Sequence, residues 1–156
     1  MRSSVAPHVI LFVAFALRIA NLNGESLWRD EVDSVRFAFE PLAVVLANFT
    51  ATGFNGPLYH LVLRGWLSLT GVSDFGLRSL SLACGVLLVA LVYALGRRLF
   101  GRPAATIAMW LTAISPVLTW YAGEGKMYSL QPALLALALY ALMRAVDGRA
   151  GEGAWA

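Results

Sequence analysis

Long stretches without a charged side chain constrain the fold of this chain more than any other feature of its sequence. Residues 79–96 and 103–123 carry no charge, and residues 127–143 are dominated by Leu and Ala. A helix needs roughly 20 mainly apolar residues to cross the hydrocarbon core of a bilayer, within a range of about 17–25. Each stretch reaches or approaches that length, so the sequence predicts an all-α polytopic membrane protein. A mean hydropathy of +0.69 agrees with this class.

Residues 5–22 form a fourth apolar stretch, with His8 near one end and Arg18 near the other. We expect the long side chain of Arg18 to reach the membrane interface, because a charge within hydrocarbon is costly. A cleaved signal peptide is the alternative, since Arg2 precedes the apolar residues. The following residues, RIANLNG, contain no good small-x-small cleavage site, which favours an uncleaved anchor.

The stretch Pro57–Gly71 decides the topology. It is short and contains His60 and Arg64 near its middle, which is typical of an interfacial helix. If it lies on the surface, the three arginines of the loop GRRLFGR face the cytoplasm, as the positive-inside rule requires. Segment 23–78, with six of the nine acidic residues, then faces outward. A spanning Pro57–Gly71 would place the three arginines outside, so we favour the surface position.

The sequence therefore predicts four spans, at about 5–22, 79–96, 103–122 and 127–144, with the amino terminus inside and an outer loop at 23–78. We expect that loop to carry two surface helices, one in EPLAVVLANF and one at Pro57–Gly71. Pro116 should end or kink the third span, because proline lacks a backbone donor.

This topology places two polar segments on the outer side, WRDEVDS at 28–34 and YAGEGKMYS at 121–129. Asp30 and Glu31 are neighbours, so their side chains point about 100° apart in a helix. We expect one carboxylate to act as a base or metal ligand, and the other to orient it or pair with a cation. The charge pattern alone favours the simpler interpretation of a solvated flank beside a membrane segment.

The remaining polar side chains also have simple interpretations. Tyr121 and Tyr128 fit the aromatic belt of a membrane interface, and His60 fits an amphipathic surface helix. Lys126 opposes the positive-inside trend, which favours a functional task. The sequence contains no zinc-ligand spacing, Gly-rich phosphate loop or nucleophile elbow. Basic residues cluster at the ends of apolar stretches and form no nucleic-acid stripe, so no nucleic-acid partner is expected.

Four sequence blocks, in this order, resemble the amino-terminal third of the GT-C membrane glycosyltransferases. The blocks are LWRDEVDSVRFA, NGPLYHLVLRGWL, FGLRSLSLACGVLLVALVYALGRRLFG and SPVLTWYAGEGKMYSL. They are most similar to bacterial protein-mannosyltransferase-like enzymes of the lipopolysaccharide-core galacturonosyltransferase and aminoarabinose transferase types. The resemblance covers roughly residues 11–143 and implies a GT-C-type helical bundle. We expect the chain to be the amino-terminal part of a longer enzyme.

Such enzymes pass a sugar from a polyprenyl-phosphate carrier to a lipid, glycan or protein acceptor at the outer face of the bacterial inner membrane. The resemblance implies that Asp30 is the base that deprotonates the acceptor hydroxyl and that Glu31 is its partner. Substrate-binding roles are expected for six further residues, Asn55, His60, Tyr121, Glu124, Lys126 and Tyr128.

Two segments depart from the family pattern. Asn55-Gly56-Pro57 stands where the family often has His-Pro-Pro or an acidic-Lys-Pro element, which removes a phosphate- or metal-binding side chain. Lys126 stands where the family commonly has arginine, so the charge is kept and the bidentate fork is lost.

The sequence leaves the cofactor open. Cleavage of the sugar–phosphate bond develops negative charge on the phosphate, which needs a preorganised cation. Lys126 is the first choice, and Arg78 or a divalent metal are alternatives. A relative that transfers an oligosaccharide or a phospho-group is the alternative enzyme. A transporter or a non-catalytic membrane assembly subunit is the alternative from another class.

Overall fold

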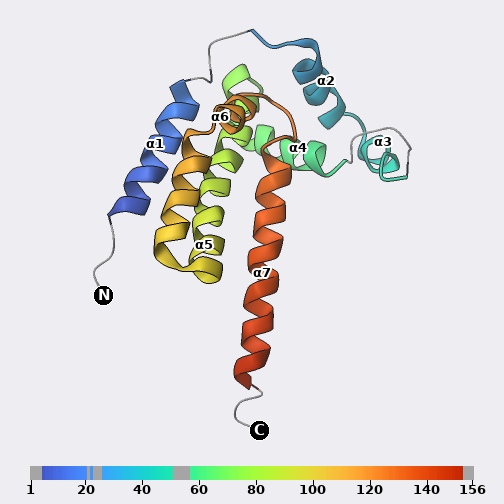
Figure 1. Ribbon diagram of the computed structural model, residues 1–156. Helices are drawn as coiled ribbons and strands as arrows, with labels where there is room; N and C mark the ends of the chain where they lie inside the picture. Colours follow the sequence, from blue (N-terminus) through green and yellow to red (C-terminus); the bar gives the residue numbers. More distant parts are fainter. Residues whose placement is uncertain (1–4, 21, 23–25, 51–56, 153–156) are drawn as a thin grey trace.

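The computed structural model describes residues 5–20, 22, 26–50 and 57–152. Within these ranges the chain forms helices and no strands, which confirms the all-α prediction (Figure 1). The helices are α1 (Ala6–Ala20), α2 (Arg29–Ala38), α3 (Leu42–Ala47), α4 (Leu58–Thr70), α5 (Asp74–Ile114), α6 (Pro116–Ala122) and α7 (Leu130–Glu152).

Helix α5 consists of two arms joined by a reversal at Gly101. Gly101 has φ 83° and ψ 178°, a conformation that residues other than glycine rarely adopt. The first arm runs down from Asp74 and the second returns beside it (Figure 1). The arms pack closely above the turn, where a Cβ on Gly96 would lie 3.0 Å from the Ala105 Cα atom. The two arms correspond to the second and third predicted spans.

The second arm ends where the sequence predicted an interruption. It stops at Ile114, and α6 begins with Pro116 in its first turn. The Ser115 hydroxyl caps the new helix by accepting the Leu118 N–H at 3.4 Å. The predicted effect of Pro116 on the third span is therefore confirmed.

Arg18 does not extend to an interface, which corrects the expectation from the sequence. Its side chain is completely buried between α1 and α5. Its Nη1 atom donates to the Ala14 and Ala113 carbonyls at 3.0 Å each, and Nη2 donates to the Thr112 carbonyl at 3.2 Å. The Thr112 and Ala113 carbonyls lie in the last turn of α5, where the helix stops before Pro116 and leaves them without helical donors.

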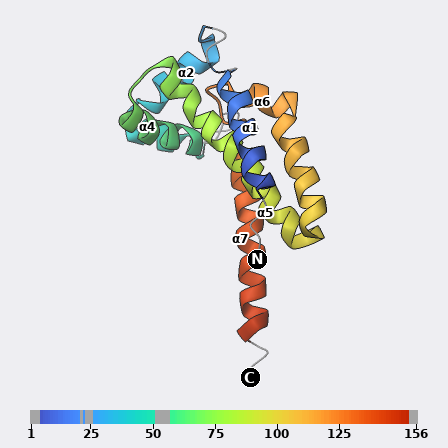
Figure 2. The same cartoon turned by 90° about the vertical axis from the view of Figure 1, so that its left-hand side faces the viewer.

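Among the described residues, two helices are long and apolar enough to cross a membrane: α5, which reverses at Gly101, and the part of α7 at Leu130–Asp147. Helix α1 is apolar but has only 15 residues, a rise of roughly 22 Å. It packs along α5, while α7 extends well past the turn at Gly101 (Figure 2). The four-span topology, with its division into spans and an outer loop, stays a prediction.

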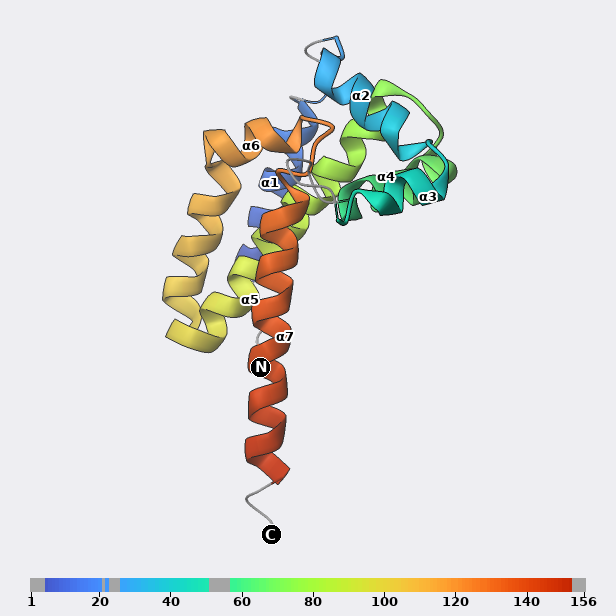
Figure 3. The same cartoon turned by 90° about the vertical axis from the view of Figure 1, so that its right-hand side faces the viewer.

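The short helices α2, α3 and α4 gather at one end of the bundle, opposite the Gly101 turn (Figure 3). Both predicted surface helices of segment 23–78 form, as α3 and α4. Trp66 anchors α4 to α5, because its Nε1 donates to the Gly76 carbonyl at 3.1 Å and the Ser79 hydroxyl at 3.0 Å. A buried core seals this end, made by Ala38, Tyr59, Leu63, Leu67, Leu77, Leu80, Leu88 and Leu130 among others.

Candidate functional site

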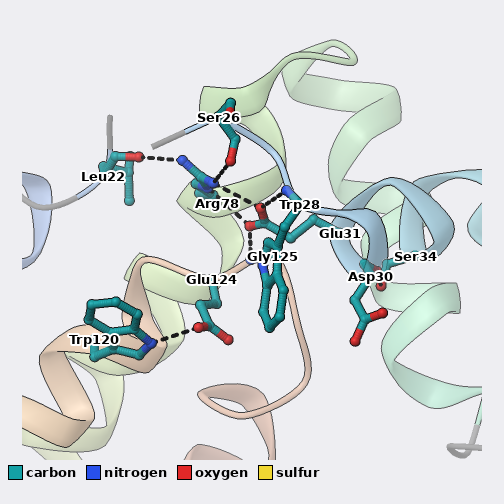
Figure 4. Close-up of polar contacts among 10 residues, drawn as sticks. All are labelled: Leu22, Ser26, Trp28, Asp30, Glu31, Ser34, Arg78, Trp120, Glu124 and Gly125. Carbon is teal, nitrogen blue, oxygen red and sulfur yellow. Dashed lines mark hydrogen bonds and ion pairs between the residues drawn. The ribbon is translucent and has the colours of Figure 1, made fainter. Parts of the chain in front are cut away.

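A buried ion pair between Glu31 and Arg78 forms the centre of this end of the bundle (Figure 4). The Arg78 Nη2 atom lies 2.8 Å from Glu31 Oε2, and Nε donates to Oε1 at 3.0 Å. Only 7% of the Arg78 side chain and none of the Glu31 side chain is exposed. The two-pronged geometry holds α2 in a fixed orientation against the N-terminal part of α5.

Arg78 also fixes the chain segment that leads into α2. Its Nη1 donates to the Leu22 carbonyl at 3.1 Å, and Nη2 reaches the Ser26 carbonyl at 3.5 Å. These contacts engage its guanidinium within the protein. Arg78 therefore serves this site as a structural cation, and the sequence alternative that it contacts a substrate phosphate finds no support in the geometry.

Gly125 joins the second polar segment to the ion pair. Its N–H donates to Glu31 Oε1 at 2.7 Å (Figure 4). The next residue is held as well, since the Ser81 hydroxyl donates to the Lys126 carbonyl at 3.2 Å. Segments 28–34 and 121–129, which the predicted topology places on one side of the membrane, thus meet at one end of the bundle.

The environment of Glu31 keeps its carboxylate ionised. Burial alone would raise its pKa. Hydrogen bonds from Arg78 and from the Gly125 N–H, together with the positive charge of Arg78, outweigh burial and lower the pKa below its ordinary value. A carboxylate held in this way is a poor proton acceptor, so Glu31 is suited to positioning rather than to base catalysis.

Asp30 has the opposite environment, although it is the neighbouring residue. Its side chain is exposed and forms no hydrogen bond or ion pair with any residue that the structure describes. The divergence of the two carboxylates follows the helical prediction, and Figure 4 shows Asp30 turned away from Glu31. The nearby arginines, Arg29 and Arg36, instead approach Asp33 at 3.8 and 3.9 Å.

A groove of about 370 Å³ opens beside α2 on the next turn after Asp30. It brings together residues from α2 and the turn after it, from the end of α3, from the start of α4 and from the second polar segment. The lining residues are Asp33, Ser34, Arg36, Phe37, Glu40, Asn48, His60 and Lys126. Two of the predicted substrate-binding residues, His60 and Lys126, therefore share one groove.

His60 is held neutral in this groove. Burial and then the nearby charge of Lys126 lower its pKa below the ordinary value of 6.5. Its ring packs edge-on against Phe37, with centroids 4.7 Å apart. The Nδ1 atom is buried and has no hydrogen-bond partner among the described residues. A neutral imidazole of this kind can donate to or accept from a hydroxyl group in the groove.

The other predicted substrate-binding residues that the structure describes lie outside the groove. Glu124 accepts a hydrogen bond from Trp120 Nε1 at 2.7 Å, as Figure 4 shows. Tyr121 and Tyr128 contact each other, with ring centroids 4.8 Å apart. None of these three side chains lines the groove. Asn55 lies outside the described residues.

Sequence reasoning missed part of the framework of this site. It considered Arg78 only as a phosphate-binding cation and gave no role to Gly125. One signal could have found Arg78, because a charged residue at the start of a long apolar helix needs a partner. Within the described ranges, no group of three His, Cys, Asp or Glu side chains has the geometry to hold a metal ion.

Residues 55–156 match the dolichyl-phosphate-mannose-protein mannosyltransferase family. The chain belongs to this family. Neither a curated protein nor a solved structure shows a significant match. Members of the dolichyl-phosphate-mannose-protein mannosyltransferase family are polytopic glycosyltransferases that use lipid-phosphate sugars. This family assignment supports the expected class of enzyme, a lipid-phosphate sugar donor and a membrane location.

The family match begins after Asp30 and Glu31, so it does not itself cover the two carboxylates. The structure links them to the matched part of the chain. Glu31 contacts Arg78 and Gly125, which both lie within the dolichyl-phosphate-mannose-protein mannosyltransferase match. The buried Glu31 contacts thus attach α2 to the part of the chain that matches the family, residues 55–156.

Proposed function

We propose that this protein transfers a sugar from a polyprenyl-phosphate carrier to an acceptor hydroxyl at the outer face of a bacterial inner membrane. The family assignment supports the reaction class and the lipid-phosphate donor. One observation carries the assignment of the site: Glu31 accepts the Gly125 N–H at 2.7 Å. This bond holds the helix of Asp30 beside the segment of Lys126.

Asp30 is the proposed base. Its exposed carboxylate takes the proton of the acceptor hydroxyl, while the acceptor oxygen forms a bond to the anomeric carbon of the sugar. The bond between that carbon and the phosphate oxygen breaks, and the carrier phosphate leaves with an added negative charge. Attack opposite the departing phosphate inverts the anomeric centre. A positioned carboxylate base typically contributes about 10²–10⁴-fold to the rate.

Lys126 is the proposed cation for the departing phosphate. Its backbone is fixed by Ser81, and its side chain lines the groove beside α2. A preorganised charge stabilises the negative charge that develops as the sugar–phosphate bond breaks. His60 faces the same groove and, as a neutral imidazole, can bind a sugar or acceptor hydroxyl. Glu31 acts through α2 and does not touch the substrate in this proposal.

The experiment is a sugar-transfer assay on the membrane-reconstituted protein with a panel of polyprenyl-phosphate sugars. Asp30→Asn should lower kcat by about 10²–10⁴-fold, as loss of a general base does. Asp74→Asn is the matched control, because this carboxylate is also exposed in the first turn of a helix and does not line the groove. It should keep transfer within a few-fold of the parent.

Equal activity of the Asp30→Asn variant and the parent would remove Asp30 from the mechanism. A non-catalytic assembly subunit or a transporter predicts no transfer by the parent with any sugar of the panel. The assembly subunit also predicts that Asp30 can be replaced without a functional loss.

A further inference from the structure

A second polar cavity lies far from the candidate site, between the two membrane-length helices. It has a volume of about 330 Å³ and is lined by Tyr93, Ala94, Arg97 and Arg98 of α5 and by Tyr140 of α7. These α5 residues precede the Gly101 turn, at the end of the bundle opposite α2 and α4 (Figure 1). The cavity therefore has no part in the proposed transfer reaction.

The cavity wall carries more positive than negative charge. The Arg97 guanidinium carbon lies 5.7 Å from the centre of the Tyr93 ring, so a cation–π contact keeps this charge at the wall. Arg98 pairs through Nη2 with Asp147 of α7. Its Nε atom is buried and donates to no acceptor in the part of the chain that the structure describes. The lining thus offers guanidinium donors and two phenol groups to an anion.

We propose that this cavity binds the phosphate headgroup of an anionic phospholipid. Guanidinium groups match phosphate oxygens in a planar, two-pronged geometry. Basic pockets between membrane helices on the cytoplasmic side are suited to anionic headgroups. The helices beside the cavity also present exposed apolar side chains, including Leu87 and Leu99 of α5 and Leu137 of α7. A phospholipid uses both features, whereas a soluble phosphate uses only the charges.

A lipid in this place would contact the first arm of α5 and α7 together. It would add to the Arg98–Asp147 ion pair, which connects the same two helices. The proposal concerns lipid binding, and it stands whether or not the transfer reaction is correct.

The test is a titration of the purified protein in neutral detergent with phosphatidylglycerol in one arm and phosphatidylcholine in the other. Bound lipid is counted by native mass spectrometry. Phosphatidylglycerol should bind more tightly than phosphatidylcholine. Arg97→Gln should weaken phosphatidylglycerol binding about fivefold, which corresponds to roughly 1 kcal/mol per basic residue near an anionic lipid surface. Tyr140→Phe should weaken it by a smaller factor.

Arg102→Gln is the matched control. It removes the same charge close to the Gly101 turn, but Arg102 does not line the cavity. Its effect on phosphatidylglycerol binding should be less than about twofold. Arg98 is left in place, because its removal would leave Asp147 without its ion-pair partner. If Arg97→Gln lowers the thermal unfolding midpoint without lipid, Arg97→Lys replaces it, since lysine keeps the charge and loses the fork.

Three outcomes would overturn the proposal. Equal binding of the two lipids would show that the cavity does not recognise the charge. Equal losses in the Arg97→Gln and Arg102→Gln variants would assign the preference to diffuse charge at this end of the protein. A third arm adds inorganic phosphate, and displacement of the lipid at millimolar phosphate would show recognition of free phosphate instead of a lipid.

Discussion

Glu31 Oε2 and Arg78 Nη2 lie 2.8 Å apart, although 47 residues separate them in the chain. Both side chains are withdrawn from solvent, and the pair attaches the short helix α2 to the start of α5. A buried pair of this kind contributes little compared with an apolar pair, but it is costly to break. Its role here is to fix the position of α2.

Arg78→Met should destabilise the protein by about 3–5 kcal/mol, because Glu31 is left as an uncompensated buried charge. The measurement is the free energy of unfolding from a denaturant titration in micelles. The double variant Glu31→Gln with Arg78→Met should recover part of this loss, since no charge stays buried. If the losses of unfolding free energy in the two single variants simply add in the double variant, Glu31 and Arg78 are not coupled.

Gly125→Ala should displace the segment that carries Lys126. A Cβ at this position would lie 2.4–2.8 Å from three side-chain atoms of Leu77, which is itself buried. Such overpacking typically costs about 1–3 kcal/mol, and the transfer rate should fall with the stability. Leu77→Ala in the same chain should restore part of the activity by making space.

Gly65→Ala is the control for this substitution, because a Cβ there meets no atom within 4 Å. It should stabilise α4 slightly, as alanine does in an exposed helix position. A Gly125→Ala variant as active as Gly65→Ala would show that the close packing on Leu77 is not required.

Lys126→Gln should raise the pKa of His60, because the charge of Lys126 is one cause of its lowering. Burial, the larger cause, persists in the variant, so the pKa should stay below 6.5. The measurement is a pH titration of the histidine ring by nuclear magnetic resonance. The chain has two histidines, so a His8→Gln background leaves a single signal. An unchanged His60 pKa would show that the charge of Lys126 does not act on the His60 ring.

Acid should weaken the attachment of α2. The folded-state pKa of Glu31 is lowered, so its stabilising contribution is fully present above the ordinary value of 4.5. That contribution is lost as the pH falls through the lower, folded-state pKa. Unfolding free energies measured from pH 6 downward should therefore decline less steeply in Glu31→Gln than in the parent. Parallel curves for the two proteins would contradict this linkage.

The predicted orientation can be tested with single cysteines and a membrane-impermeant thiol reagent. Ser26→Cys should be labelled in intact cells, and Phe100→Cys should be protected until the membrane is opened. Phe100 is 74% exposed beside the turn and is preferable to Gly101, whose positive φ would strain a cysteine. The background variant carries Cys84→Ser, which removes the single native thiol. The reverse labelling pattern would invert the topology.

The sequence was most informative where one pattern determines one structure. Uncharged stretches predicted the long helices, Pro116 predicted the break after Ile114, and adjacency predicted that Asp30 and Glu31 diverge. Contacts between distant segments were not predictable, because many basic residues could have paired with Glu31. Arg29 and Arg36 were nearer in sequence, and the partner proved to be Arg78. The groove that combines His60 with Lys126 depends on such contacts, so it emerged only from the structure.

The burial of Arg18 has a consequence for how the protein is built in the cell. In the predicted topology the Thr112 and Ala113 carbonyls lie within the bilayer, where lipid offers no water to groups that the end of α5 leaves without helical partners. The guanidinium of α1 supplies those donors, so the returning arm of α5 depends on a helix that is synthesised about 90 residues earlier, since the Arg18 contacts span 94 and 95 residues. Synthesis therefore supplies the donor before the acceptors, because the ribosome has completed α1 when it makes the arm of α5 that needs the guanidinium.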